Sequence, residues 1–228
     1  FYTKVLPLVV AEVWLFGYAF SSDLRTCQVI LGLLGLWWCI AALWVEVKLE
    51  QAYPGFDHAN PVDPEMKAYR PFCDFAPWAT CSKVLMSPPG RFLRYFGVAK
   101  PLVGEGILDR VRDFIDVPNP TLGVLFFGCH LGYPALLLLP IPCIPQLFLL
   151  ACCGCGVMVF WLAYNLVFVL GDFCVVCVSM YVALLAAIPM MRGLCAVGSS
   201  FQDFPDFFGA VPLPLLIPFL AVDSAMLV

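Results

Sequence analysis

Residues 147–191 read LFLLACCGCGVMVFWLAYNLVFVLGDFCVVCVSMYVALLAAIPMM, and this stretch decides the fold. It is apolar almost throughout, and its one clear break is Gly171-Asp172. As a single helix it would be roughly 65 Å long at 1.5 Å per residue, about twice the thickness of the bilayer core. We therefore expect two membrane-spanning helices, at 147–170 and 173–191, joined by a tight turn at Gly171-Asp172.

Two further apolar stretches precede this pair. Residues 27–47 have the length of a membrane span, and so do residues 121–139. The composition agrees, because 62% of the 228 residues are hydrophobic, 12% are charged and the mean hydropathy is +0.93. The sequence predicts an all-α integral membrane protein, a four-transmembrane-helix bundle surrounded by membrane lipid. A net charge of −4 without a basic run excludes a nucleic-acid partner.

The spans divide the chain into three regions. Residues 1–26 are an apolar segment, and the sequence leaves open whether it is an interfacial helix, a short span or a targeting remnant. Residues 27–191 form the four-helix bundle and include a polar loop at 48–119. Within that loop, residues 107–115 have apolar residues at helical spacing, so they predict an amphipathic helix. It either lies on the bilayer, or caps a site, or packs on its own loop. Residues 192–228 are an apolar tail that Arg192 separates from the last span.

Two cysteine pairs lie on the same side of the predicted membrane. With four spans, the loop at 48–119 and the turn at Gly171-Asp172 face one side, so Cys73–Cys81 and Cys174–Cys177 face it together. The other side receives Arg25 and Arg192, which agrees with the tendency of basic residues to stay in the cytoplasm. The pairs are therefore expected on the lumenal side, where disulfides persist.

The pair Cys174-Val-Val-Cys177 opens the fourth span. Asp172 is placed to cap this helix, and Cys174 then falls in the first turn, where free backbone amides and the helix dipole stabilise a thiolate. Two cysteines separated by two residues at this position favour a redox-active dithiol over an inert crosslink.

The cysteines and His130 could also bind a metal or pack in the core. The four cysteines could in principle bind zinc, but the C-x7-C spacing of Cys73 and Cys81 fits structural zinc sites poorly, and we expect no metal. The remaining eight cysteines lie in or beside apolar runs and are expected to be small core residues. His130 lies in the middle of a span and is expected to be a packed or hydrogen-bonded core residue.

Three segments also carry a resemblance. Residues 69–84 (YRPFCDFAPWATCSKV), 118–123 (PNPTLG) and 168–177 (FVLGDFCVVC) together resemble the vitamin K epoxide reductase family. The likeness covers residues 27–191 and is closest to eukaryotic members without a fused thioredoxin domain. The combination of C-x7-C-S-K-V with D-F-C-x-V-C is specific, whereas either motif alone is weak.

The resemblance implies a four-helix catalytic bundle around a quinone, closed by a lumenal cap. The implied activity is a thiol–disulfide oxidoreductase that reduces a vitamin K-like quinone, such as phylloquinone, menaquinone or ubiquinone. Cys174 and Cys177 would be the active-site pair, with Cys177 attacking the substrate. Cys81 would exchange with Cys174, and Cys73 would exchange with a partner.

The resemblance also assigns binding residues. Asn119 matches the family's asparagine that donates a hydrogen bond to a quinone oxygen. Phe173 would line the ring pocket, and Ser82 follows the family pattern beside the relay cysteine. Gly171 stands where animal members have a tyrosine, which removes a hydroxyl that could donate to the substrate in epoxide reduction.

No thioredoxin-like domain follows the last span, so we expect an external lumenal thioredoxin-like redox protein as partner, with other membrane subunits as further candidates. The endoplasmic reticulum membrane is the expected location, and a thylakoid or other organelle membrane is the alternative. A disulfide oxidase of the bacterial type would carry its CxxC in the first loop, unlike this chain. A non-catalytic structural subunit of a larger membrane complex stays open as an alternative function.

Overall fold

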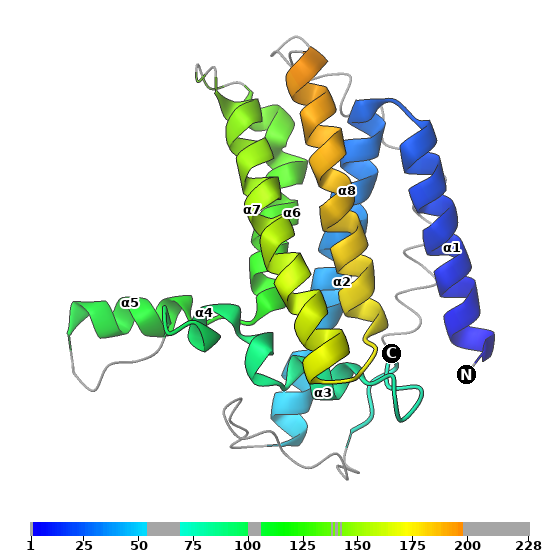
Figure 1. Cartoon of the computed structure of the whole chain (residues 1–228), viewed down its shortest axis with the longest axis vertical. Helices are drawn as coiled ribbons and strands as arrows, with labels where there is room; N and C mark the ends of the chain where they lie inside the picture. The colour runs from blue at the N-terminus through cyan, green and yellow to red at the C-terminus, as the bar shows by residue number, and fades with distance from the viewer. Residues whose placement is uncertain are drawn as a thin grey trace. The chain divides into compact units, whose positions relative to one another are not determined.

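The described part of the chain is built almost entirely from helices. The structure, a computed structural model, describes residues 2–53, 69–99, 106–137, 139, 141 and 143–197. Within these ranges there is one isolated β-bridge, between Ala76 and Ala79, and no strand. The long helices, labelled in Figure 1, are α1 (Tyr2–Ser21), α2 (Leu24–Ala52), α6 (Asn119–Leu136), α7 (Ile144–Tyr164) and α8 (Val175–Val197). The short elements are α3 (Cys81–Leu85), the 3₁₀ turn η1 (Pro88–Gly90), α4 (Phe92–Tyr95), α5 (Ile107–Ile115) and the π-helical turn η2 (Asn165–Val169).

Three of the described helical segments are long and apolar enough to cross a membrane. They are α2, the continuous segment Ile144–Val169 formed by α7 and η2, and α8. Helix α6, with 18 residues, takes the place of the predicted span 121–139. The prediction of an all-α integral membrane protein is confirmed.

Several predicted boundaries need correction. Helix α2 continues to Ala52, so the polar loop does not begin at Lys48. Helix α8 passes through Arg192 to Val197, since residues 193–197 contain no proline that would end it. The apolar segment near the N-terminus forms helix α1, and the alternatives of an interfacial helix, a short span or a targeting remnant stay open. Residues 54–68 and 100–105 of the predicted loop and residues 198–228 of the predicted tail lie outside the described residues.

The chain divides into two compact units by its internal contacts. One, the cysteine unit, comprises residues 38–125 and 162–178 and contains α3, α4, α5 and all four predicted redox cysteines. The other unit comprises residues 1–37, 126–161 and 179–228.

In the second unit, glycines let the helices approach closely. A Cβ atom on Gly32 of α2 would lie 2.9 Å from the Leu131 side chain of α6, and one on Gly156 of α7 would lie 2.9 Å from Ile188 of α8. Close packing at small residues is the usual way in which membrane helices associate. A Cβ atom on Gly35 would overlap the buried ring of Phe127.

Several buried polar side chains in this unit have hydrogen-bond partners, which a membrane interior favours. Gln28 donates from Nε2 to the carbonyl oxygen of His130 at 3.0 Å, and the His130 ring contacts the Phe126 carbonyl oxygen at 3.0 Å. Its other ring nitrogen lies 3.3 Å from the Cys152 sulfur. Ser179 donates to the buried Glu12 carboxylate at 3.0 Å. The expectation that His130 is a hydrogen-bonded core residue is confirmed.

The packing at Gly35 gives a test of the α2–α6 contact. Gly35→Ala should destabilise the protein by about 1–3 kcal/mol, because the added methyl group meets a buried ring that has no room to move. Thermal unfolding in detergent would measure the change. Gly128→Ala in α6 is the matched control, since nothing lies within 4 Å of a Cβ atom there. Equal unfolding midpoints for the two variants would contradict the tight contact.

Candidate active site

The four predicted redox cysteines lie together in the cysteine unit. Cys81 is the first residue of α3, and Cys174 directly precedes α8. Their sulfur atoms are 3.4 Å apart, and the Cys81 thiol also points to the carbonyl oxygen of Cys73 at 3.8 Å. Cys73, Cys81, Cys174 and Cys177 are buried, with exposed fractions of 1%, 0%, 0% and 5%. The two pairs thus meet through Cys81 and Cys174, with all twelve cysteines of the chain as free thiols.

The sulfur of Cys174 caps helix α8. The backbone N–H of Cys177 donates to this sulfur at 3.3 Å, which is the contact that an N-cap side chain makes with the third residue of a helix. The prediction that Asp172 caps this helix is therefore wrong. The helix begins at Val175, two residues later than that cap requires, and the capping atom is the reactive sulfur itself.

This arrangement concentrates negative charge on Cys174. Burial alone would raise its pKa, but hydrogen bonding with the Cys177 and Cys81 side chains and with the Cys177 amide lowers the pKa of Cys174 to about 5. Burial raises the pKa of Cys73 and of Cys81. In the reduced protein at neutral pH, Cys174 is therefore the thiolate of the group, and Cys73 and Cys81 are thiols.

Asp172 binds the segment that carries Cys81. Its buried carboxylate lies 2.5 Å from Lys83 Nζ and accepts a hydrogen bond from the Thr80 hydroxyl at 3.1 Å. Lys83 also donates to the carbonyl oxygen of Leu170 at 3.2 Å. Thr80, just before Cys81, and Lys83, two residues after it, are thus bound to the turn that precedes Cys174.

A backbone contact completes this attachment. Ala76 to Ala79 form a tight turn in which the Ala79 N–H donates to the Ala76 carbonyl oxygen at 2.9 Å. The carbonyl oxygen of Trp78, in this turn, accepts from the Phe173 N–H at 2.9 Å. The segment that carries Cys81 therefore contacts Asp172 through side chains and Phe173 through the backbone.

Gly171 shapes the turn before Cys174. Its φ of +61° is in the left-handed region, which glycine adopts without strain and a tyrosine does not. Nothing lies within 4 Å of a Cβ atom at this position, so the backbone angle, not the space, favours glycine. The family tyrosine is thus replaced here by a residue that this turn conformation requires.

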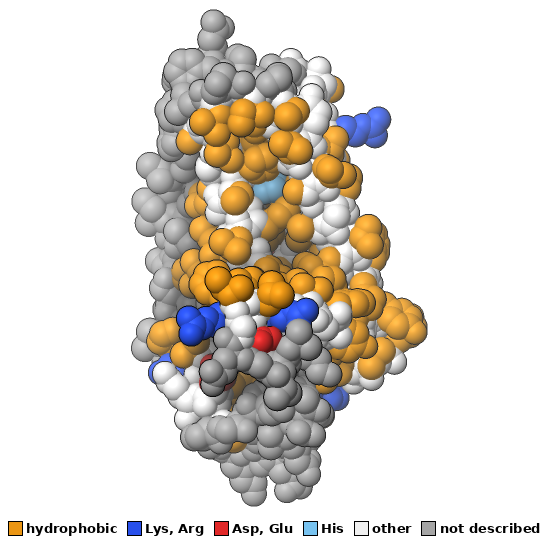
Figure 2. Space-filling view, turned by 90° about the vertical axis from the view of Figure 1, so that its left-hand side faces the viewer, with side chains coloured by type: hydrophobic (Ala, Val, Ile, Leu, Met, Phe, Trp, Pro, Cys, Tyr) orange, Lys and Arg blue, Asp and Glu red, His pale blue; other side chains and the backbone are white. Residues whose placement is uncertain are grey.

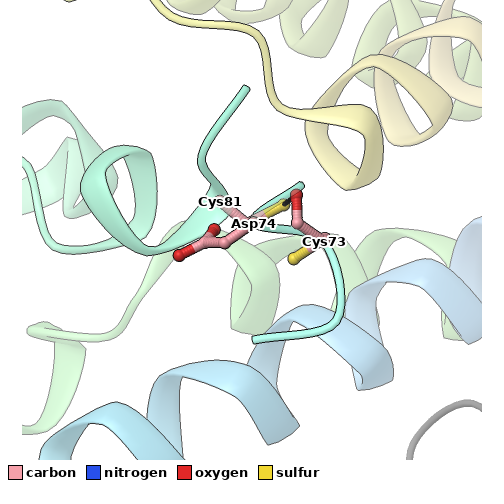
Figure 3. Close-up of side chains that lie close together, drawn as sticks. All are labelled: Cys73, Asp74 and Cys81. Atoms are coloured by element: carbon pink, nitrogen blue, oxygen red, sulfur yellow. Dashed lines mark hydrogen bonds between the residues drawn. The ribbon is translucent and has the colours of Figure 1, made fainter. Parts of the chain in front are cut away.

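Asp74 and Ser82 hold helix α3 in place. The Ser82 backbone N–H donates to one Asp74 carboxylate oxygen at 3.0 Å, and the Ser82 hydroxyl donates to the other. Cys73, Asp74 and Cys81 lie together in Figure 3, with one potential ligand atom from each within 4.8 Å of the others. Two thiols and a carboxylate are ligands that zinc accepts. However, Asp74 already uses both oxygens to bind Ser82, and the absence of a metal stays a prediction.

Asn119 is the first residue of α6, and its amide binds a neighbouring segment. Its side-chain oxygen accepts from the Phe92 N–H at 2.7 Å, and its side-chain nitrogen donates to the Pro89 carbonyl oxygen at 2.7 Å. An asparagine amide has two N–H donors, and within the described ranges one of them remains for another acceptor.

Aromatic side chains lie beside the cysteine group. Phe173 is adjacent to Cys174 in sequence and is 39% exposed, and its ring centre is 6.4 Å from that of Trp78. Trp78 is 63% exposed and also contacts Phe75 edge to face. These rings offer an apolar surface next to the buried thiols.

The sequence did not reveal the roles of Asp74, Thr80, Lys83 and Trp78. One signal was available for Lys83, because a lone carboxylate in a long apolar stretch, such as Asp172, needs a cationic partner. Nothing in the sequence indicated which lysine or arginine that would be. Asp74 gave no local signal, since it lies eight residues before the serine that it binds.

The fold and this site define an integral membrane protein with a buried group of four free thiols at the end of a membrane helix. The model of the Vitamin K epoxide reductase family matches residues 27–191, and the chain belongs to this family. Membership assigns it to membrane proteins that couple thiol oxidation to the reduction of quinones. The matched range is the one over which the sequence resemblance was expected.

The charge on Cys174 can be titrated directly. The absorbance of thiolates near 240 nm, measured on the reduced protein, should show a step with a midpoint of about 5. Cys174→Ser should remove this step because the stabilised thiolate is lost. Cys153→Ser, which changes an exposed cysteine, should leave the step in place. A wild-type protein whose thiols all titrate above pH 8 would contradict the assignment.

Proposed function

We propose that this protein is a membrane thiol–disulfide oxidoreductase that reduces a quinone with electrons relayed through its two cysteine pairs. The observation that carries the proposal is the 3.4 Å contact between the Cys81 and Cys174 sulfurs in a buried site. A thiolate attacks a disulfide through direct approach of sulfur to sulfur, so a relay needs such a contact between the pairs.

In the proposed relay, a partner dithiol first reduces a Cys73–Cys81 disulfide. Cys81 then attacks Cys174 in a Cys174–Cys177 disulfide, and Cys177 leaves and takes up a proton. Cys73 attacks Cys81 in the resulting mixed disulfide, and Cys174 leaves as a thiolate. Two electrons move from the first pair to the second. The lowered pKa of Cys174 supports the last step, because a thiol of low pKa is a good leaving group.

The reduced pair then delivers these electrons to the quinone. Cys177 adds to a ring carbon while its proton passes to Cys174, along the hydrogen bond between the two sulfurs. Cys174 next passes this proton to a quinone oxygen and attacks the Cys177 sulfur, the carbon–sulfur bond breaks, and the Cys174–Cys177 disulfide forms again. The quinone has gained two electrons and two protons, one from Cys177 and one from solution, and leaves as a hydroquinone.

Three further residues are proposed around the substrate. The free N–H of Asn119 would donate to a quinone oxygen, and Phe173 would contact the ring with its exposed face. The hydroxyl of Ser82 is bound to Asp74, which favours a role in holding α3 over direct contact with the quinone. Because Gly171 offers no hydroxyl, the proposal covers quinone reduction and not epoxide reduction.

The partner and the location are part of the same proposal. A lumenal thioredoxin-like protein would deliver electrons to Cys73, and the quinone would be a vitamin K-like molecule taken from the lipid. The endoplasmic reticulum is proposed because the C-S-K-V sequence at residues 81–84 resembles eukaryotic family members.

The activity can be tested with the purified protein, dithiothreitol and a short-chain naphthoquinone or ubiquinone. Wild-type protein should form hydroquinone above the protein-free rate, and Cys177→Ala should abolish this turnover because no thiol remains to attack the ring. Cys73→Ala should lose less activity, since dithiothreitol replaces the natural electron donor. Cys153→Ala is the matched control and should match the wild type.

Two results would contradict the proposal. Full turnover by Cys177→Ala would show that this cysteine is not the attacking group. A folded wild-type protein that reduces none of the quinones would instead favour the non-catalytic structural subunit.

A further inference from the structure

Asn119 takes its orientation from a short turn, residues 89–92. Its side-chain oxygen accepts from the Phe92 N–H, and its side-chain nitrogen donates to the Pro89 carbonyl oxygen, each at 2.7 Å. Because both ends of the amide are bound, the direction of its second N–H depends on where the turn lies. Whatever holds the turn therefore also sets the direction in which Asn119 can donate to a quinone.

The turn cannot hold its own position. It consists of residues at the end of η1, which has three residues, and at the start of α4, which has four. Helical segments of this length are not stable alone, because nucleation of a helix is unfavourable. Contacts with other parts of the cysteine unit must therefore fix the turn.

Arg91 makes such contacts from inside the turn. Its side chain is 15% exposed. Nη1 donates to the Asp116 carbonyl oxygen at 3.0 Å, and Nη2 donates to the Glu50 carboxylate at 3.2 Å. Nη2 also lies 3.8 Å from the carboxyl group of Glu46, which is buried in α2. Arg91 thus connects the turn both to α2 and to the segment that leads into α6.

The geometry of these contacts requires an arginine. The two terminal nitrogens of its planar guanidinium serve different partners, one on Asp116 and the other on α2. A lysine carries the same charge on a single nitrogen and cannot occupy both places. A lysine at position 91 would therefore keep the charge and lose one of the two connections.

A second arginine strengthens the connection on the α6 side. Arg94 Nε donates to the Asp116 carboxylate at 2.8 Å, and the Asp116 side chain is only 9% exposed. Figure 2 shows the side of the molecule on which α4 and α5 lie in Figure 1, and basic and acidic side chains gather there. Asp116 closely precedes Asn119 in sequence, so residues 116–119 and 89–94 are bound to each other at several points.

We propose that Arg91 is a positioning residue for the quinone, acting through the turn 89–92 and the Asn119 amide. It keeps the second N–H of Asn119 aimed at the quinone oxygen without touching the quinone itself. This inference rests on the proposed function, because it concerns the same substrate site. It assigns a role in quinone reduction to a residue that the thiol relay does not use.

The direction of this N–H matters most while the quinone reacts. Addition of Cys177 to the ring places negative charge on a quinone oxygen, and a donor aimed at that oxygen stabilises the transition state. Loss of one such donor typically slows a reaction by about 10²–10³-fold. A donor that is present but misdirected should cost less, roughly tenfold.

Two half-reactions of the full chain separate positioning from folding. Fully reduced protein is mixed with a saturating short-chain naphthoquinone, and hydroquinone formation in one turnover is followed by stopped flow. Oxidised protein is mixed with dithiothreitol, and the appearance of protein thiols is followed. Arg91→Lys should slow the first reaction roughly tenfold and leave the second unchanged, because the turn lies outside the relay. Arg110→Lys, at an exposed arginine of α5, is the matched control and should change neither rate.

A double variant tests the path through Asn119. Asn119→Ala removes the donor, so adding Arg91→Lys to it should change the rate of quinone reduction by less than about twofold. Reduction by dithiothreitol at the wild-type rate shows that each variant is folded.

Three results would overturn the inference and leave the proposed function standing. The first is quinone reduction by Arg91→Lys at the wild-type rate. The second is an equal slowing of both half-reactions, which indicates a general structural role. The third is the full effect of Arg91→Lys in the Asn119→Ala background. A folded wild-type protein that reduces no quinone would instead overturn the proposed function and this inference together.

Discussion

The ion pair between Asp172 and Lys83 determines how the two cysteine pairs meet. Cys81 is carried by a helix of only five residues, too short to hold its own position. Asp172 is buried at the end of a membrane segment, where an unpaired carboxylate is costly, so it strongly favours a nearby cation. Lys83 supplies that cation, and Thr80 binds the other carboxylate oxygen. The need to pair one charge thereby brings the Cys81 sulfur to the Cys174 sulfur.

The contact between the pairs gives each thiol a different property. The Cys174 sulfur contacts the Cys81 sulfur at 3.4 Å and accepts a hydrogen bond from the Cys177 backbone amide, and these contacts lower its pKa although it is fully buried. Cys81 stays protonated, because burial raises its pKa. Its thiolate fraction increases with pH throughout the neutral range. In the proposed relay, attack by Cys81 is therefore the step that speeds up as pH rises, whereas the departure of Cys174 is already easy.

The membrane spans and the cysteine pairs could be predicted from the sequence because they depend on local composition and spacing. An apolar stretch twice the bilayer thickness must turn, and Gly171-Asp172 was its one polar break. The prediction that Asp172 caps α8 was wrong. Aspartate is a residue type that favours the N-cap position, but the Asp172 carboxylate forms an ion pair with Lys83 instead. An N-cap side chain stabilises a helix by about 1 kcal/mol. Leaving a buried carboxylate without a cationic partner costs more, so the ion pair is favoured over the cap. The contacts of Asn119 and Asp74 connect segments through tertiary structure, and no periodicity or motif encodes them.

The central claim is that the contacts of Asp172 with Lys83 and Thr80 hold Cys81 against Cys174. Disulfide mapping tests this claim most directly. In the variant Cys73→Ser/Cys177→Ser, mild oxidation should join Cys81 to Cys174, and peptide mass spectrometry would quantify this disulfide. Adding Asp172→Ala should lower its yield several-fold, while adding Asp113→Ala on the exposed face of α5 should not change it. A yield unaffected by Asp172→Ala, or a Cys81 that pairs with a different cysteine, would contradict the account.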